Sequence, residues 1–216
     1  MSVPVEISES WEFVHAEVVW LHGRWIVYRQ LFGTNSERID LTNWAAPTFF
    51  GFIQRVLVND VQLTLAKLAD PAKTQGRENA TLESLVTLLE QVDVNAPVKR
   101  LKDKLKEYRE DCEYIRQRRN KDIAHFDREV QLGEKAEILP NPSREEIETS
   151  LKSLRQFMNI LFAHYENTQM AYEHFSMLND GNTLMHRLTQ AHRYEQLEEL
   201  GVISQEDILK SPYSQV

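Results

Sequence analysis

The sequence has a single cysteine, few glycines and prolines, and no long hydrophobic run. Because Cys112 stands alone, an intrachain disulfide and a cysteine-based metal site are both excluded. Seven glycines and seven prolines in 216 residues favour long helices over a turn-rich β fold. No segment reaches the roughly 18 apolar residues that suggest a membrane-spanning helix. The N-terminal residues lack the basic start and apolar run of a signal peptide, so we expect a cytoplasmic protein with no membrane partner.

The charge of the chain limits where it could bind nucleic acid. The net charge is −8, so the surface as a whole does not attract RNA or DNA, and any contact requires a local basic patch. One such patch contains the following residues: Arg109, Arg116, Arg118, Arg119, Lys121 and Arg128. The histidines outside this patch are not spaced as metal ligands on a helix. We therefore expect no metal site and no cofactor.

Hydrophobic periodicity predicts an all-α protein, an up-and-down bundle of about five to six helices. The expected helices span about residues 8–32, 43–68, 82–91, 98–124, 144–178 and 183–200. Thr42 is the expected N-cap of the second helix, and Ser143 with Glu146 forms a predicted capping box before the fifth.

The connections between these helices are polar. Residues 34–41 are predicted to be a loop and residues 72–79 a polar link without strands. The segment 126–142, after the helix that carries the basic patch, is predicted to be an unusually long loop, which is often functional. Residues 1–178 are expected to form the helical bundle. Residues 179–216 would add a C-terminal helix and tail, packed on the same domain or in a dimer interface.

Residues 119–127 read Arg-Asn-Lys-Asp-Ile-Ala-His-Phe-Asp and combine the side chains needed to cut RNA without a metal. The imidazole of His125 can take or give a proton near neutral pH. An arginine guanidinium matches phosphate oxygens and can stabilise charge in the transition state. Asn120 can fix the geometry through hydrogen bonds.

Spacing leaves the arginine partner of His125 open. In one continuous helix Arg118 lies seven residues before His125 and shares its face. Arg119, six residues before it, joins the histidine only if the helix ends or distorts near Ile123. A structural interpretation also competes, in which the histidine only interacts with the negative end of the helix dipole.

The segment 119–127 resembles the Arg-Asn-Lys-x-x-Ala-His-x-Asp signature of the HEPN superfamily, in particular its abortive-infection U-type branch. A second segment, residues 59–61, 68–74 and 78–85, is similar to the middle of that branch. The resemblance covers roughly residues 10–175. It implies a helical HEPN domain that forms a homodimer, with two motifs facing each other across a cleft in a composite RNase site. Many members are toxins or antiphage effectors, so an antitoxin or regulatory protein is a possible partner besides the RNA substrate.

The resemblance also implies roles for single residues. Arg119 would bind the scissile phosphate, Asn120 would orient the site, and His125 would act as general base or acid. The expected substrate-binding residues are Arg118, Lys121, Arg116 and Asp127. Asp60 is a further candidate to orient His125.

Two other interpretations stay open at the level of sequence. The first is a non-catalytic HEPN module that binds a nucleotide, RNA or a partner protein in the same basic cleft. The second is a structural helical protein. The aromatic side chains of the fifth predicted helix would serve the core, a dimer or a partner protein: Phe157, Phe162, Tyr165, Tyr172 and Phe175.

Overall fold

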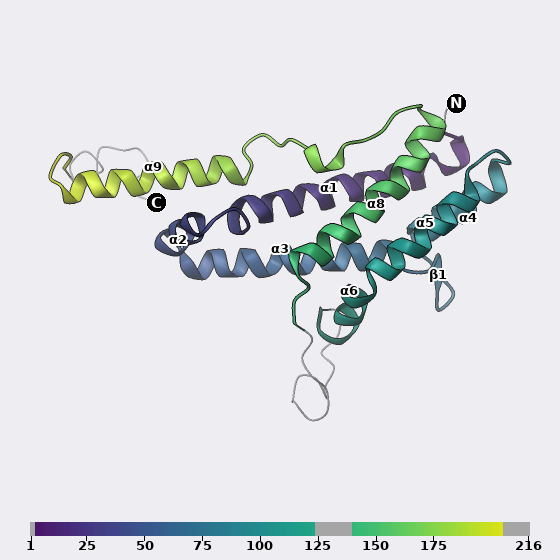
Figure 1. The fold of residues 1–216 in the computed structure, drawn as a ribbon, viewed down its shortest axis with the longest axis horizontal. Helices are drawn as coiled ribbons and strands as arrows, with labels where there is room; N and C mark the ends of the chain where they lie inside the picture. The colour runs from purple at the N-terminus through teal and green to yellow at the C-terminus, as the bar shows by residue number, and fades with distance from the viewer. Residues whose placement is uncertain (1–2, 124–139, 205–216) are drawn as a thin grey trace, which may run out of the picture. The chain divides into compact units, whose positions relative to one another are not determined.

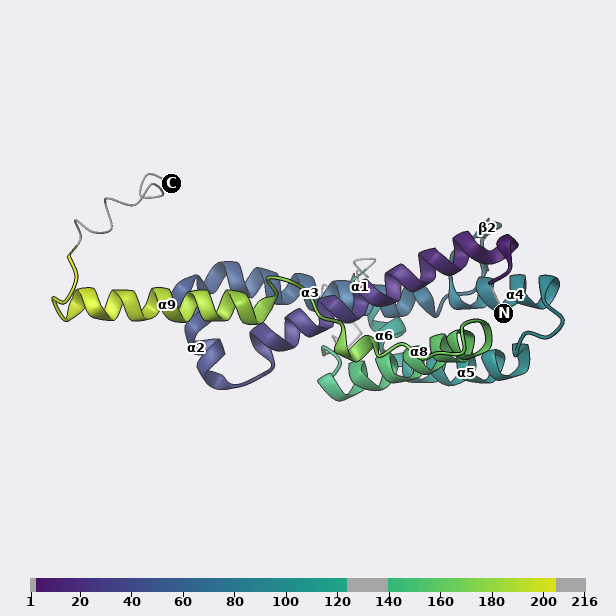
Figure 2. The same ribbon diagram turned by 90° about the horizontal axis from the view of Figure 1, so that it is seen from above.

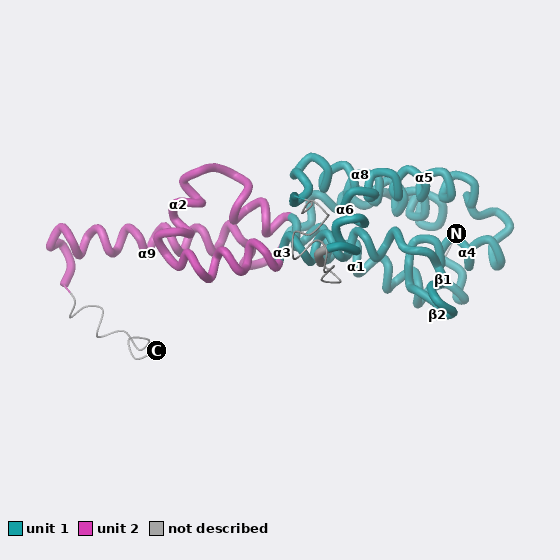
Figure 3. Tube along the Cα trace, turned by 90° about the horizontal axis from the view of Figure 1, so that it is seen from below, with its two compact units in different colours: residues 1–25, 57–176 teal, residues 26–56, 177–216 magenta. Residues whose placement is uncertain are grey.

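The computed structural model describes residues 3–123 and 140–204, which are almost entirely helical (Figure 1). Eight α-helices and one two-stranded sheet occur in these ranges, which confirms the all-α prediction. The chain forms two compact units, coloured separately in Figure 3. Unit 1 comprises residues 1–25 and 57–176, and unit 2 comprises residues 26–56 and 177–216. The predicted division into residues 1–178 and 179–216 stays a prediction.

Several helices begin where the sequence predicts. The helices α1 (Ser8–Phe32), α4 (Leu82–Val92) and α9 (Gly181–Glu199) lie close to their expected bounds. The capping box before α8 (Arg144–Tyr165) is confirmed, because the Ser143 hydroxyl accepts from the Glu146 amide at 3.1 Å and the Glu146 carboxylate accepts from the Ser143 amide at 2.6 Å.

The region between α1 and α3 differs from the prediction. The helix α2 (Ser36–Ala45) begins within the expected loop, because Asn35 caps it by accepting from the amide of Arg38 at 3.1 Å. Thr42 is buried inside α2 and caps no helix. The helix α3 (Pro47–Leu68) begins at its proline, which fits a first helical turn and disfavours the α conformation of the residue before it.

The helix predicted over residues 98–124 is divided into three parts. They are α5 (Val98–Asp111), α6 (Glu113–Arg118) and the π-helical turn η2 (Arg119–Ile123). At the break between α5 and α6, the hydroxyl of Ser150 on α8 donates to the carbonyl of Asp111 at 3.0 Å. A side chain that bonds into the helical ladder in this way is a known cause of a helix kink.

The helix α8 ends well before the predicted residue 178. Asn167 adopts a left-handed φ of 51°, which is typical of the residue just past a helix. The Asn159 side chain then bonds both backbone groups of Met170, at 2.7 and 3.1 Å, and so holds the returning chain. A short 3₁₀ turn, η3 (Tyr172–His174), follows.

A small β-hairpin lies where the sequence predicts a link without strands. Its strands are β1 (Lys73–Thr74) and β2 (Arg77–Glu78), joined antiparallel with Lys73 opposite Glu78 and Thr74 opposite Arg77. The turn residues Gln75 and Gly76 have φ of 50° and 80°. Positive φ at both positions is the requirement of the tight hairpin turns that match strand twist. Glutamine is uncommon in this conformation, so the residues of this turn do not indicate a hairpin.

In unit 1 the helices are tied together through buried side chains. The helix α5 packs along α8 (Figure 2), and the Tyr108 hydroxyl on α5 donates to the carbonyl of Leu65 on α3 at 2.7 Å. The Trp25 indole on α1 donates to Glu148 on α8 at 2.7 Å. Four of the aromatic residues that could have served a dimer are instead buried within the chain: Phe157, Phe162, Tyr165 and Tyr172.

In unit 2 the helix α2 packs against α9. The indole of Trp44 donates to Glu195 at 2.6 Å. Gly181 begins α9 so close to α1 that a Cβ would lie 2.9 Å from the amide oxygen of Gln30 and 3.0 Å from its Cβ. Within the described part of the chain, no helix is both long enough and apolar enough to cross a membrane. The predicted loop lies outside the described residues except for positions 140–142.

Candidate functional site

The predicted site residues fall on α6, on η2 and beyond them. The structure describes Arg116, Arg118, Arg119, Asn120 and Lys121. The predicted base His125 and the predicted substrate ligand Asp127 lie outside the described residues.

The motif begins in a π-helical turn. Such turns are rare and occur frequently at functional sites, and their i→i+5 hydrogen bonds lengthen each turn relative to an α-helix. The rule that residues seven apart share one face applies to an α-helix. It therefore does not apply across Arg119–Ile123, and it no longer favours Arg118 as the partner of position 125. The two arginines are distinguished by their surroundings.

Arg118 is buried at the contact between α6 and α3, and its role as a substrate ligand stays a prediction. It is only 7% exposed, and its Nη1 donates to the side-chain oxygen of Gln62 on α3 at 2.8 Å. Gln62 is itself fully buried, and its amide donates to the Val58 carbonyl at 3.2 Å. Arg118 thus links α6 to α3 and lies away from the open surface.

Arg119 is more accessible and is held from two sides. Its Nη1 lies 2.6 Å from Oδ2 of Asp70, and its Nε donates to the side-chain oxygen of Asn120 at 3.0 Å. The side chains of Arg119 and Asp70 are 14% and 24% exposed. A partly solvated ion pair contributes at most about 1 kcal/mol, so the main effect of these contacts is to orient the guanidinium. Its Nη2 has no hydrogen-bond partner within the described ranges.

The segment that carries Asp70 is fixed to α5 by Arg109. The Arg109 guanidinium donates to the carbonyls of Ala69 at 2.9 Å and Asp70 at 3.3 Å, and it pairs with Glu83 at 3.0 Å. Glu83 also accepts from the amide of Ala72 at 2.7 Å. The hydrogen bond from Arg109 lowers the pKa of Glu83 below its ordinary value. The ion pair of Arg119 with Asp70 and the contacts of Arg109 with Ala69, Asp70 and Glu83 together connect the start of the motif to residues 68–85.

No sequence pattern marks Asp70 as a site residue, although it lies in the second resembling segment. Asp60, which we considered instead, forms an ion pair with Arg24 at 2.6 Å. The two aspartates differ in position, because Asp60 lies inside α3 whereas Asp70 lies just past its end, before a proline.

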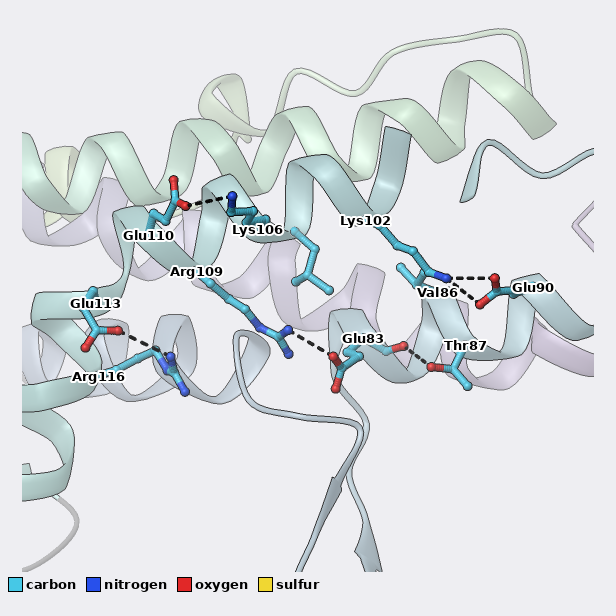
Figure 4. Close-up of a pocket in the computed structure, with 11 residues that line it drawn as sticks. Glu83, Val86, Thr87, Glu90, Lys102, Lys106, Arg109, Glu110, Glu113 and Arg116 are labelled. Carbon is cyan, nitrogen blue, oxygen red and sulfur yellow. Dashed lines mark hydrogen bonds and ion pairs between the residues drawn. The ribbon is translucent and has the colours of Figure 1, made fainter. Parts of the chain in front are cut away.

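A groove of about 670 Å³ lies between α4, α5 and α6, and Figure 4 shows its lining. Each of its four basic side chains pairs with a glutamate. The pairs are Lys102 with Glu90 at 2.7 Å, Arg109 with Glu83 at 3.0 Å, Arg116 with Glu113 at 3.6 Å and Lys106 with Glu110 at 3.8 Å. The charges of the groove therefore cancel. Arg116 is part of this balanced surface, and its role as a substrate ligand stays a prediction.

Comparison with known proteins identifies the family. The AbiU2 model of HEPN domains matches residues 6–184, which is most of the chain. The chain belongs to the AbiU2 family. No curated protein and no solved structure matches it. In this AbiU2 protein, the motif and the middle segment that carry the resemblance meet at the contact between Arg119 and Asp70. Among the described residues, no group of three or more His, Cys, Asp or Glu side chains could hold a metal ion.

Proposed function

We propose that this AbiU2-family protein is a metal-independent endoribonuclease of the HEPN type that acts in the cytoplasm as an antiphage or toxin-like effector. The observation that carries the proposal is the geometry of Arg119. Its guanidinium is oriented by Asp70 and Asn120, and its Nη2 has no partner among the described residues, six positions before His125. Membership of the AbiU2 family supports the same function.

The proposed reaction needs a base, an acid and a fixed cation. The imidazole of His125 takes the proton of a ribose 2′-hydroxyl, and the 2′-oxygen attacks the adjacent phosphorus. Arg119 binds a non-bridging oxygen and stabilises the charge that accumulates on the phosphorane-like transition state. The bond to the 5′-oxygen breaks as that oxygen receives a proton. The products are a 2′,3′-cyclic phosphate and a 5′-hydroxyl end.

A homodimer would complete this site. In an isologous dimer two copies of the motif lie opposite each other, so one His125 can serve as base and the other as acid. The mass of the purified protein in solution, measured by light scattering, tests this part of the proposal. A monomer at the concentrations where RNA is cleaved would contradict it. An antitoxin or regulatory protein is the further partner that we expect.

The direct test is RNA cleavage in the presence of EDTA. We expect the wild-type chain to produce 2′,3′-cyclic phosphate ends, and His125→Ala and Arg119→Ala to lose roughly 100-fold or more in rate. His186→Ala is the matched control, because His186 is an exposed histidine on α9 outside the motif, and we expect it to keep full activity. Equal cleavage by wild type and His125→Ala, or no cleavage by either, would contradict a catalytic role. Binding of RNA without cleavage would instead favour a non-catalytic module.

A further inference from the structure

The hairpin arm, defined as residues 73–78, follows closely after the residue that pairs with the candidate catalytic arginine. Its first strand begins three residues after Asp70, whose carboxylate pairs with Arg119 at 2.6 Å. Three residues of extended chain span at most about 11 Å, so Lys73 starts close to the site.

The base of the hairpin arm is clamped on both sides. Arg109 and Glu83 hold the chain at residues 69–72 through three hydrogen bonds. On the other side, the Asn79 amide donates to the Pro71 carbonyl and to the Thr74 hydroxyl, both at 2.8 Å. An isolated two-stranded hairpin is marginally stable in water, so these clamps explain why such a short one persists here.

The cations of the hairpin arm differ from those of the neighbouring groove. Lys73 and Arg77 are exposed, and neither has an ion-pair or hydrogen-bond partner for its side chain in the described residues. Exposed Lys67, in the last turn of α3, is likewise unpaired there. Every basic residue that lines the groove, in contrast, is matched by a glutamate.

The carboxylates near the arm leave Arg77 without an opposing charge in the strand ladder. Asp70 is engaged by Arg119. Glu78 lies opposite Lys73 in the ladder, whereas Arg77 lies opposite the uncharged Thr74 and on the other face. The face of the hairpin that carries Arg77 therefore carries no carboxylate of the hairpin.

We propose that the hairpin arm binds the backbone of single-stranded RNA next to the scissile phosphate, with Arg77 and Lys73 as its phosphate ligands. This inference rests on the ribonuclease function proposed above, and it adds the surface along which the RNA substrate binds. On a chain with net charge −8, unpaired cations beside the site decide where a polyanion can approach. An arginine at a tight turn also offers a planar set of donors to a phosphate.

The test measures binding apart from cleavage. Full-length His125→Ala protein is titrated into a fluorescent, mixed-sequence, single-stranded RNA, and Kd is followed by anisotropy at increasing NaCl. Adding Lys73→Ala and Arg77→Ala should weaken binding roughly tenfold and reduce the slope of log K against log salt by about 1.4, the value for two lost contacts to a single strand. Arg77→Lys with Lys73 intact should keep the slope, because the charge is retained.

The matched control is Lys102→Ala with Lys106→Ala, which removes two cations that are already paired with glutamates. We expect it to change neither Kd nor slope. Equal losses in both double variants, an unchanged slope in the hairpin variant, or no RNA binding by the parent protein would overturn the proposal. If the hairpin effect appears but the wild-type chain does not cleave RNA, the ribonuclease proposal fails while the binding arm stands.

Discussion

The guanidinium of Arg119 in η2 reaches the carboxylate of Asp70, just after α3, at 2.6 Å. The same guanidinium is bonded through Nε to the neighbouring Asn120. The two contacts engage two of the three nitrogens of the planar group. Among the described residues nothing bonds Nη2, which leaves this nitrogen for a ligand, as a phosphate-binding arginine requires.

Asp70→Asn tests whether this ion pair positions Arg119. The substitution preserves size but removes the charge, and we expect kcat for RNA cleavage to fall roughly 10- to 100-fold with little change in KM. Asp70→Glu should recover part of the loss because it restores the carboxylate. Unfolding temperature should stay close to wild type, since the pair is partly solvated. The measurement is steady-state cleavage kinetics together with a thermal melt.

Glu110→Gln is the control for Asp70→Asn, because it removes an exposed carboxylate that pairs with Lys106 and not with Arg119. It should leave kcat unchanged. A rise in activity for Asp70→Asn would mean that the carboxylate masks Arg119 from substrate, which is the opposite of positioning.

Arg118→Ala and Arg119→Ala should separate structural from functional loss. Removing Arg118 leaves the buried side chain of Gln62 without its donor and opens space between α6 and α3, so we expect a cost of about 3 kcal/mol. That corresponds to a fall in unfolding temperature of roughly 10 °C for a chain of this size. Arg119→Ala should cost less than about 1 kcal/mol. Urea unfolding of both variants measures the difference, and equal destabilisation would refute the assignment.

The sequence predicts the helical class and the position of the motif, because both depend on local patterns. The apolar stripe of α1 and the capping box at Ser143 need only neighbouring residues to be recognised. The helix break at Cys112 could not be predicted in this way. It coincides with a hydrogen bond from Ser150, which is far away in sequence.

The choice between the two arginines shows the same limit at the site. Spacing left Arg118 and Arg119 equal, and what distinguishes them is burial against α3 in one case and a contact with Asp70 in the other. Both contacts span about 50 residues of sequence or more. Helical periodicity carries no information on such contacts, so the partner of Arg119 became evident only in three dimensions.

Cys112 should be unreactive in the folded protein. It is fully buried, and burial raises the pKa of its thiol to about 11, so almost no thiolate is present at neutral pH. We expect a thiol reagent such as DTNB to label no cysteine in native protein at pH 7, and one cysteine per chain after unfolding in urea. Rapid labelling of the native protein would show that the junction between α5 and α6 opens readily.

His22 makes folding stability depend on pH. Its ring is 2% exposed, Nδ1 donates to the Val18 carbonyl at 2.8 Å, and Nε2 faces Nη1 of Arg155 at 3.4 Å. Burial is the main cause that lowers the pKa of His22 from 6.5 to about 4, and the nearby charge of Arg155 acts in the same direction. The bond to Val18 and the charges of Glu173 and Glu148 oppose the shift.

In the unfolded chain His22 binds a proton near pH 6.5, whereas in the native protein the same ring is protonated only near pH 4. The stabilisation is fully present above pH 6.5 and is lost as pH falls toward 4, because the unfolded state binds more protons in this window. We expect the free energy of unfolding to fall by about 2 kcal/mol between pH 7 and pH 5 on account of this residue. His22→Gln should lose that part of the pH dependence, whereas His186→Gln, at an exposed site on α9, should retain it. Urea unfolding curves at the two pH values decide the matter, and parallel pH dependence in wild type and His22→Gln would show that His22 is not the responsible group.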